Sequence, residues 1–224
     1  MRSTPTRFGV LGGLALWLAV ALAAAVFAPA ATTDAARGAP ATRQAFHDQM
    51  RMLWAGDHIV WTRCFIVSTA TLRRNLPDTE ATTMRLLENQ TAIGNAFKPF
   101  YGGAAGDELT ALLRVHILTA AQIIAAAKAG DDAAAAAAIE AWYANAHDIA
   151  VLLNRLNPDN WPVAAVEDLL RAHLDLTLEE ALARLGGNYE GDIAAYDKVH
   201  AQILTLADAL SNGIIAQFPE RFAS

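Results

Sequence analysis

Residues 130–158 read GDDAAAAAAIEAWYANAHDIAVLLNRLNP, and this stretch decides the class of fold. Asp131 is a favourable N-cap, the alanines that follow it are the strongest helix formers, and Asn157-Pro158 stops the helix. Between these boundaries the apolar side chains follow the 3.6-residue period of an α-helix. The stretch therefore predicts one long helix that ends at Leu156, and its small side chains allow close approach to neighbouring helices.

The same signals recur along the rest of residues 42–224, and no convincing strand pattern accompanies them. They predict further helices over residues 43–75, 79–97, 107–129, 163–174, 177–185 and 192–217. The short helix at 177–185 is expected because Thr177-Leu178-Glu179-Glu180 has the pattern of a capping box. Short connections favour antiparallel neighbours, so we expect a single all-α domain that forms an up-and-down bundle. Its four long helices are the first, third, fourth and last, and the second, fifth and sixth pack beside them.

The first thirty residues have the pattern of an export signal. Arg2 and Arg7 precede an uncharged apolar run over residues 8–27, and Ala28-Pro29-Ala30 offers a cleavage site of small residues. The run is also long enough to cross a bilayer, so an uncleaved N-terminal anchor is the alternative for residues 1–30. In either case we expect a periplasmic or extracellular domain, held at the inner membrane if the anchor stays. Residues 31–41 are rich in alanine and threonine and form the expected linker.

Composition excludes several classes of protein. The 224 residues are 54% hydrophobic and 18% charged, which is unlike a disordered chain. The net charge of −6 argues against nucleic acid as a partner, because phosphate binding needs a basic surface. One cysteine excludes both a disulfide framework and a thiolate zinc site within a single chain.

Several predicted helices carry an acid or a histidine on their apolar face, where a polar group without a partner costs roughly 2–7 kcal/mol. Asp197 and His200 lie one turn apart, the spacing by which bundle proteins supply two metal ligands from one helix. His116 and His173 occupy core positions of the third and fifth predicted helices. Together these residues predict a metal site with histidine and carboxylate ligands in the bundle interior. The candidate ligands are His58, Glu88, His116, Asp148, His173, Asp197 and His200.

Imidazole and carboxylate ligands without thiolate suit iron, copper, zinc or manganese. Haem held by histidine is a further option, although the chain has no Cys-x-x-Cys-His motif. The alternative is a non-catalytic interaction or scaffold protein of the cell envelope, in which arginines neutralise buried acids and no metal is bound. The arginines in question are Arg63, Arg85 and Arg114, and the acids are Asp57, Glu88 and Asp148.

No catalytic residue is assigned by the sequence. A hydrolase is the third hypothesis, without motif support, because the chain lacks Gly-x-Ser-x-Gly and His-Glu-x-x-His. The expected partner is a metal ion, and contact with a membrane is expected only through residues 8–27 if they are not removed. The alanine-rich fourth helix could also pack against a second copy of the chain, so a homo-oligomer is a further expectation.

Several separated stretches form a combined pattern. They are Trp61-Thr62-Arg63, Phe65-Ile66-Val67-Ser68, Arg85-Leu86-Leu87-Glu88-Asn89-Gln90, Ile93-Gly94-Asn95, Leu112-Leu113-Arg114-Val115-His116-Ile117, Trp142-Tyr143-Ala144-Asn145-Ala146, Asn157-Pro158, Trp161-Pro162, His173-Leu174, Asp192-Ile193-Ala194-Ala195-Tyr196-Asp197, Ala207-Asp208 and Gln217-Phe218-Pro219. The pattern spans residues 44–222 and resembles a family of poorly characterised bacterial helical proteins that are often exported. Members of that family sometimes carry a glycosyltransferase label, which this chain does not support because it has no Asp-x-Asp motif and no nucleotide-binding α/β pattern. The resemblance implies a single folded unit and no catalytic residues.

Overall fold

A computed structural model describes residues 42–69 and 74–222, and all their regular structure is helical. The elements are α1 (Arg43–Arg51), the π-helical segment η1 (Met52–His58), α2 (Ile59–Thr69), α3 (Thr79–Tyr101), α4 (Gly103–Ala129), α5 (Asp132–Leu156), α6 (Val163–Leu185), α7 (Tyr189–Gln217) and a final 3₁₀ turn (Pro219–Arg221). The all-α bundle predicted from the sequence is confirmed. The expected signal or anchor at residues 1–30 and the linker at residues 31–41 lie outside the described residues.

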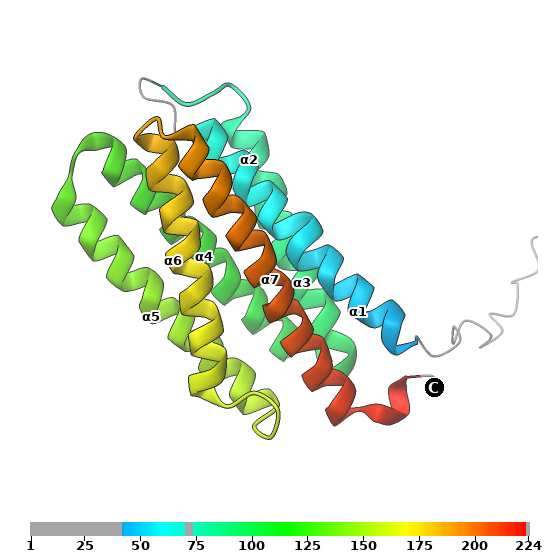
Figure 1. Ribbon diagram of the computed structural model, residues 1–224. Helices are drawn as coiled ribbons and strands as arrows, with labels where there is room; N and C mark the ends of the chain where they lie inside the picture. Colours follow the sequence, from blue (N-terminus) through cyan, green and yellow to red (C-terminus); the bar gives the residue numbers. More distant parts are fainter. Residues whose placement is uncertain (1–41, 70–73, 223–224) are drawn as a thin grey trace, which may run out of the picture. The chain divides into compact units, whose positions relative to one another are not determined.

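The helices run alternately up and down (Figure 1). α1, η1 and α2 follow one another without a break and form one rod, which we call the first rod. Each of the later helices packs against the next, and α7 also packs against the first rod. Because the direction alternates, the first rod, α4 and α6 run parallel to one another. α2 also contacts α4 and α6, so these three parallel helices meet inside the bundle.

The boundaries differ from the sequence prediction in five places. α2 ends at Thr69, and Asn75, the expected end of the first helix, is not helical. The expected fifth and sixth helices form one helix, α6, which is as long as α3. Thr177, expected to cap a new helix, is buried, and its hydroxyl donates to the carbonyl of His173 one turn earlier, at 2.8 Å. α3 continues through Pro99 to Tyr101, and α4 and α7 begin several residues earlier than expected. Continued burial of an apolar face therefore outweighs local start and stop signals. The described residues form six long helices, so the expectation of four long helices with three shorter ones packed beside them is wrong.

The first rod contains a π-helical segment in its middle. The backbone N–H of Ile59 donates to the carbonyl of Trp54, five residues earlier, which widens the turn. Trp54 and His58, which lie in this segment, are both buried. The side-chain amide of Asn89 on α3 donates to the carbonyl of Leu53 at 3.0 Å. π-Helical segments are rare in proteins, and those that occur are often found at functional sites. This segment carries His58.

α4 is, among the described residues, the one helix long and apolar enough to cross a membrane by length and composition alone. About 39% of its most apolar window is buried against the other helices. A core helix of a soluble protein passes the same test. The feature is therefore weak evidence for a membrane segment.

Candidate functional site

Three histidines lie together inside the bundle. His58 ends the π-helical segment, His116 lies in the middle of α4, and His173 lies in α6. Their exposed fractions are 2%, 4% and 3%. The ring centre of His173 is 5.5 Å from that of His58 and 6.3 Å from that of His116. These three residues, which we call the histidine centre, come from the three parallel helices.

Asn145 on α5 orients the imidazole of His116. Its side-chain nitrogen donates to the carbonyl of Leu112 at 3.2 Å, which identifies the other amide atom as the oxygen. That oxygen lies 3.1 Å from Nδ1 of His116 and can only accept, so Nδ1 carries the proton. Nε2 of His116 therefore keeps its lone pair. The indole of Trp142 packs against the same imidazole, with ring centres 5.1 Å apart.

Gln90 on α3 touches His58 from another side. Its side-chain nitrogen lies 3.3 Å from Nδ1 of His58, and it also donates to the carbonyl of Leu86 and to Oδ1 of Asn89. Trp54 packs edge-on against His58, with ring centres 5.5 Å apart. α3 and α5, which run opposite to the first rod, α4 and α6, thus supply the amides that contact His58 and His116.

Burial keeps the three imidazoles neutral. It lowers the pKa of His58 to about 3 and the pKa of His116 to about 4. The pKa of His173 is also lowered, by burial first and by repulsion from the other two imidazoles second. At neutral pH all three rings are therefore uncharged, and a neutral imidazole is the form that binds a metal ion.

Buried polar atoms without a partner gather around the histidine centre. Among the described residues, six buried side-chain atoms make no hydrogen bond, and five of them belong to or adjoin the centre. These five are Trp54 Nε1, Thr62 Oγ1, Gln90 Oε1, Trp142 Nε1 and His173 Nδ1. A buried polar group left without any partner costs about 1–3 kcal/mol, so these five atoms are available to bind a ligand or water.

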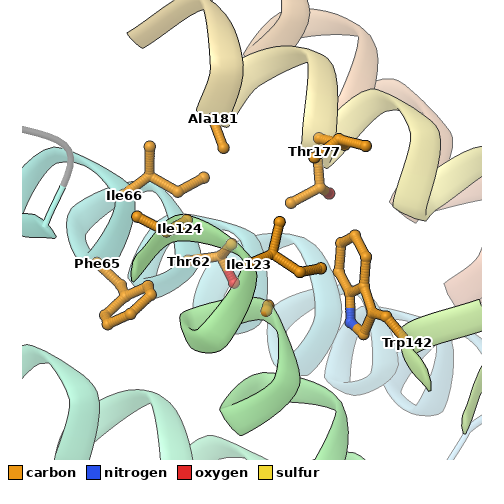
Figure 2. A pocket seen from close by; sticks show the side chains of 10 residues that line it. Thr62, Phe65, Ile66, Ile123, Ile124, Trp142, Thr177 and Ala181 are labelled. Atoms are coloured by element: carbon orange, nitrogen blue, oxygen red, sulfur yellow. The ribbon is translucent and has the colours of Figure 1, made fainter. Parts of the chain in front are cut away.

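A small cavity lies between α2, α4, α5 and α6, and none of the three histidines lines it (Figure 2). Thr62, Ala120 and Thr177 line it, and each lies four residues, about one helical turn, after one of the three histidines. Because their helices are parallel, all three steps lead in the same direction along the bundle. The remaining walls are the indole of Trp142 and the apolar side chains of Phe65, Ile66, Ile123, Ile124, Leu178 and Ala181.

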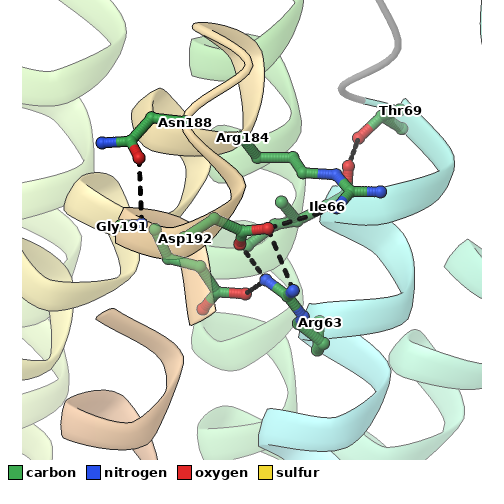
Figure 3. A network of polar contacts seen from close by, with 8 residues as sticks. Arg63, Ile66, Thr69, Arg184, Asn188, Gly191 and Asp192 are labelled. Atoms are coloured by element: carbon green, nitrogen blue, oxygen red, sulfur yellow. Dashed lines mark hydrogen bonds and ion pairs between the residues drawn. The ribbon is translucent and has the colours of Figure 1, made fainter. Parts of the chain in front are cut away.

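A second buried polar cluster joins α2, α6 and α7 (Figure 3). Asp192, which is fully buried, accepts hydrogen bonds from Arg63 at 3.0 Å and from Arg184 at 3.2 Å. Arg63 also donates to Glu180 at 2.9 Å. Burial raises the pKa of Glu180 to about 7, although the hydrogen bond from Arg63 opposes this shift. Sequence reasoning missed both acids, because Glu180 was assigned to a capping box and Asp192 to a helix start.

The other predicted ligands do not contact the histidine centre. Glu88, Asp148 and Asp197 are exposed. His200 is half-buried and lies beside Tyr196, with ring centres 6.3 Å apart. In the part of the chain that the structure describes, no group of three or more histidine, cysteine or acidic side chains stands ready to hold a metal ion. The predicted set thus divides into three clustered histidines and four separate residues.

The expected ion pairs are present in part. Arg85 pairs with Asp57 at 2.9 Å, as the sequence suggested. Arg63 pairs with Glu180 and Asp192 instead, and Arg114 donates to the carbonyl of Leu87 at 3.3 Å.

The chain was compared with protein-family models, curated proteins and solved structures, and nothing matches it. The family resemblance therefore stays a hypothesis. The structure itself defines an all-α bundle with three neutral histidines in its interior.

Proposed function

We propose that this protein is a metal-binding helical bundle whose ligands are the imidazoles of His58, His116 and His173. The observation that carries the proposal is their convergence from three parallel helices in a buried interior. Charged or polar groups rarely occupy such positions unless they are partnered. Three neutral nitrogen bases in one place provide the donors that a transition-metal ion needs.

The separation of the rings is compatible with one bound ion. Imidazole nitrogens that bind zinc at about 2.0–2.1 Å in tetrahedral geometry hold their ring centres about 5 Å apart. Two of the separations in the histidine centre are 5.5 Å and 6.3 Å. Binding would therefore require the rings to turn and to close by about an ångström. The metal site would thus form only on binding, because the described residues contain no ready-made metal group.

The surroundings of His116 also support the proposal. A histidine that binds a metal almost always donates its other ring N–H to an oxygen, which fixes the tautomer. Nδ1 of His116 donates to Asn145 in this way, and Nε2 is left with its lone pair. Unpartnered Oε1 of Gln90 could accept from His58 after a rotation of the amide.

The donor set favours zinc or copper. Imidazole suits both ions, whereas manganese and many iron sites use carboxylates, and the predicted carboxylates lie on the surface here. Three protein ligands leave a fourth position open for a small molecule, as in catalytic zinc sites. We further propose, from residues 1–30, that the protein holds this metal outside the cytoplasm.

A metal titration tests the proposal. Full-length protein, stripped with chelator, is titrated with zinc and, anaerobically, with copper(I), and binding is followed by competition with a chromophoric chelator. We expect one ion per chain, and at least a tenfold loss of affinity in each of His58→Gln, His116→Gln and His173→Gln. His147→Gln is the control, because His147 is exposed and pairs with Glu167. Binding that all three variants retain, or that His147→Gln abolishes, would refute the proposal.

The second candidate is the metal-free interaction or scaffold protein. The buried cluster of Arg63, Glu180, Asp192 and Arg184 favours it, because these acids are neutralised within the chain. In that case the buried polar residues stabilise the fold and bind no metal ion. The melting temperature would then be the same with chelator and with an excess of either metal ion, whereas a bound ion raises it.

A further inference from the structure

We infer that Gln90 on α3 is a positioning residue, which keeps His58 from binding the metal ion until the side-chain amide of Gln90 turns. The inference rests on the proposed function, because His58 is one of the three proposed ligands. It adds the step by which the site forms. The metal-free protein holds the ring protons of His58 and His116 on different nitrogens, and metal binding makes the two histidines alike.

The side-chain amide of Gln90 has a fixed orientation. The side chain is fully buried, and its nitrogen lies 2.8 Å from the carbonyl oxygen of Leu86 and 3.1 Å from Oδ1 of Asn89. The carbonyl of Leu86 can only accept, and Oδ1 of Asn89 is the oxygen because the other amide atom donates to the carbonyl of Leu53. Both protons of the Gln90 nitrogen therefore have an acceptor, and Oε1 has no partner.

This orientation determines which nitrogen of His58 carries the proton. Nδ1 of His58 lies 3.3 Å from the nitrogen of Gln90, which can donate a hydrogen bond but cannot accept one. A proton on Nδ1 would point at the N–H groups of the amide, so the proton of this neutral imidazole lies on Nε2. His116 has the opposite arrangement, because Asn145 accepts a hydrogen bond from its Nδ1.

In this arrangement neither nitrogen of His58 is ready to bind a metal ion. Nδ1 has the lone pair but faces the amide of Gln90, and Nε2 carries the proton. A histidine that binds a metal almost always donates its other ring N–H to an oxygen. If the amide of Gln90 turns, its unpartnered Oε1 becomes that acceptor. The proton then lies on Nδ1, Nε2 gains the lone pair, and His58 keeps one ring proton and stays uncharged.

The turn of the amide breaks the contacts with Leu86 and Asn89. If the amide turned in place, Oε1 would take the position of the nitrogen, so both hydrogen bonds would be lost and two oxygens would face it. Metal binding is therefore weaker than it would be with the acceptor already in place. Asn89→Leu keeps the branched shape of the side chain but removes one of the two facing oxygens. This replacement should strengthen metal binding.

Nuclear magnetic resonance of full-length, ¹⁵N-labelled protein tests the inference directly. Long-range ¹H–¹⁵N spectra show which ring nitrogen carries the proton. In the metal-free protein at neutral pH, we expect the proton of His58 on Nε2 and that of His116 on Nδ1. With one equivalent of zinc, both protons should lie on Nδ1. A proton on Nδ1 of His58 before zinc is added, or one that stays on Nε2 after zinc is bound, would overturn the inference.

Zinc affinity is then compared between two matched variants of the full-length protein. Asn89→Leu should bind zinc about threefold to tenfold more tightly than the unchanged protein, which corresponds to one hydrogen bond. Asn157→Leu is the control, with unchanged affinity expected. Asn157 is also buried, donates to the carbonyl of Gly213 and accepts from the amide of Asn160, but it caps the end of α5.

The outcomes separate this inference from the proposed function. If zinc binds but Asn89→Leu binds it no more tightly, or if Asn157→Leu gains as much, the inference is wrong and the proposed function stands. If the unchanged protein binds no metal ion, the proposed function fails, and the role of Gln90 in metal binding fails with it.

Discussion

His116 illustrates how the fold controls a single ionisable residue. Asn145 fixes its tautomer, Trp142 covers its ring, and burial lowers its pKa to about 4. In the unfolded chain the pKa returns to about 6.5. Between these two values the unfolded state binds the additional proton, so His116 stabilises the fold above pH 6.5 and this contribution is lost as the pH falls toward 4.

The replacement His116→Gln isolates this effect. The difference in unfolding free energy between the protein and this variant should shrink by up to roughly 3 kcal/mol as the pH falls from 7 to 4. Urea unfolding of the metal-free proteins at several pH values measures the difference. In the folded protein, the NMR signals of the His116 ring should stay those of neutral imidazole at pH 5. Protonation of this ring near pH 6.5 in the folded state would contradict the account.

Glu180 should respond to pH in the opposite sense. Burial raises its pKa to about 7, above the value of 4.5 in the unfolded chain. Its contribution to stability is therefore present below pH 4.5 and is lost as the pH rises through 7. A glutamine at position 180 is uncharged at every pH and therefore resembles the protonated form of Glu180.

The variant Glu180→Gln should thus gain stability relative to the unchanged protein between pH 5 and 8, by up to roughly 3 kcal/mol. Urea unfolding at both pH values gives the comparison. Glu179→Gln is the matched control, because Glu179 is an exposed neighbour that pairs with Lys198. A difference between Glu180→Gln and the unchanged protein that is the same at pH 5 and pH 8 would contradict a raised pKa of Glu180.

Sequence periodicity located part of the candidate site. It placed His116 and His173 on apolar faces because a histidine interrupts those faces visibly, and both are buried. It also selected Glu88 and Asp148, which lie beside apolar residues in the sequence yet point outward. Successive residues of a helix point in directions about 100° apart, so neighbouring residues can face the interior and the surface. For a residue at the edge of an apolar face, the sequence pattern does not show which of the two it faces.

At the scale of the helices, caps and chain breakers predicted where most elements begin and end. They failed where burial overrides a local signal, as at Thr177, where the apolar face continues through an apparent capping box. The π-helical turn before His58 has no local sequence signature of this kind, because it depends on contacts with α3. The sequence also did not predict the close packing of α3 on α4, because this packing depends on Gly94 in α3 and Gly106 in α4.

This packing yields a prediction about Gly94. A Cβ added there would lie 2.4 Å from the backbone carbonyl oxygen of Gly106, so α3 and α4 would have to move apart. Gly94→Ala should therefore lower the unfolding free energy by about 1–3 kcal/mol, although alanine favours the helix itself. Gly103→Ala is the matched control, because a Cβ there meets nothing within 4 Å. Equal stability of the two variants in urea unfolding would show that the helices are not in such close contact.

At the scale of the molecule, the up-and-down topology brings the histidines together. His58, His116 and His173 follow the first residues of their rods by 15, 13 and 10 residues, so parallel helices place them at similar heights. The predicted topology did not select these three histidines from the seven candidates, because it divided α6 into two helices and so reversed the direction expected for the last helix, which carries Asp197 and His200. The predicted carboxylates could not be removed from the sequence alone, because the direction of a side chain depends on the rotation of each helix about its axis.

The most direct test of the metal-binding account is the zinc K-edge X-ray absorption spectrum of full-length protein loaded with one equivalent of zinc. We predict first-shell nitrogen or oxygen ligands at about 2.0 Å and outer-shell scattering from three imidazoles. In the variant with His58, His116 and His173 all replaced by Gln, this imidazole scattering should disappear. A spectrum with no imidazole scattering, or one that the triple replacement leaves unchanged, would contradict the account.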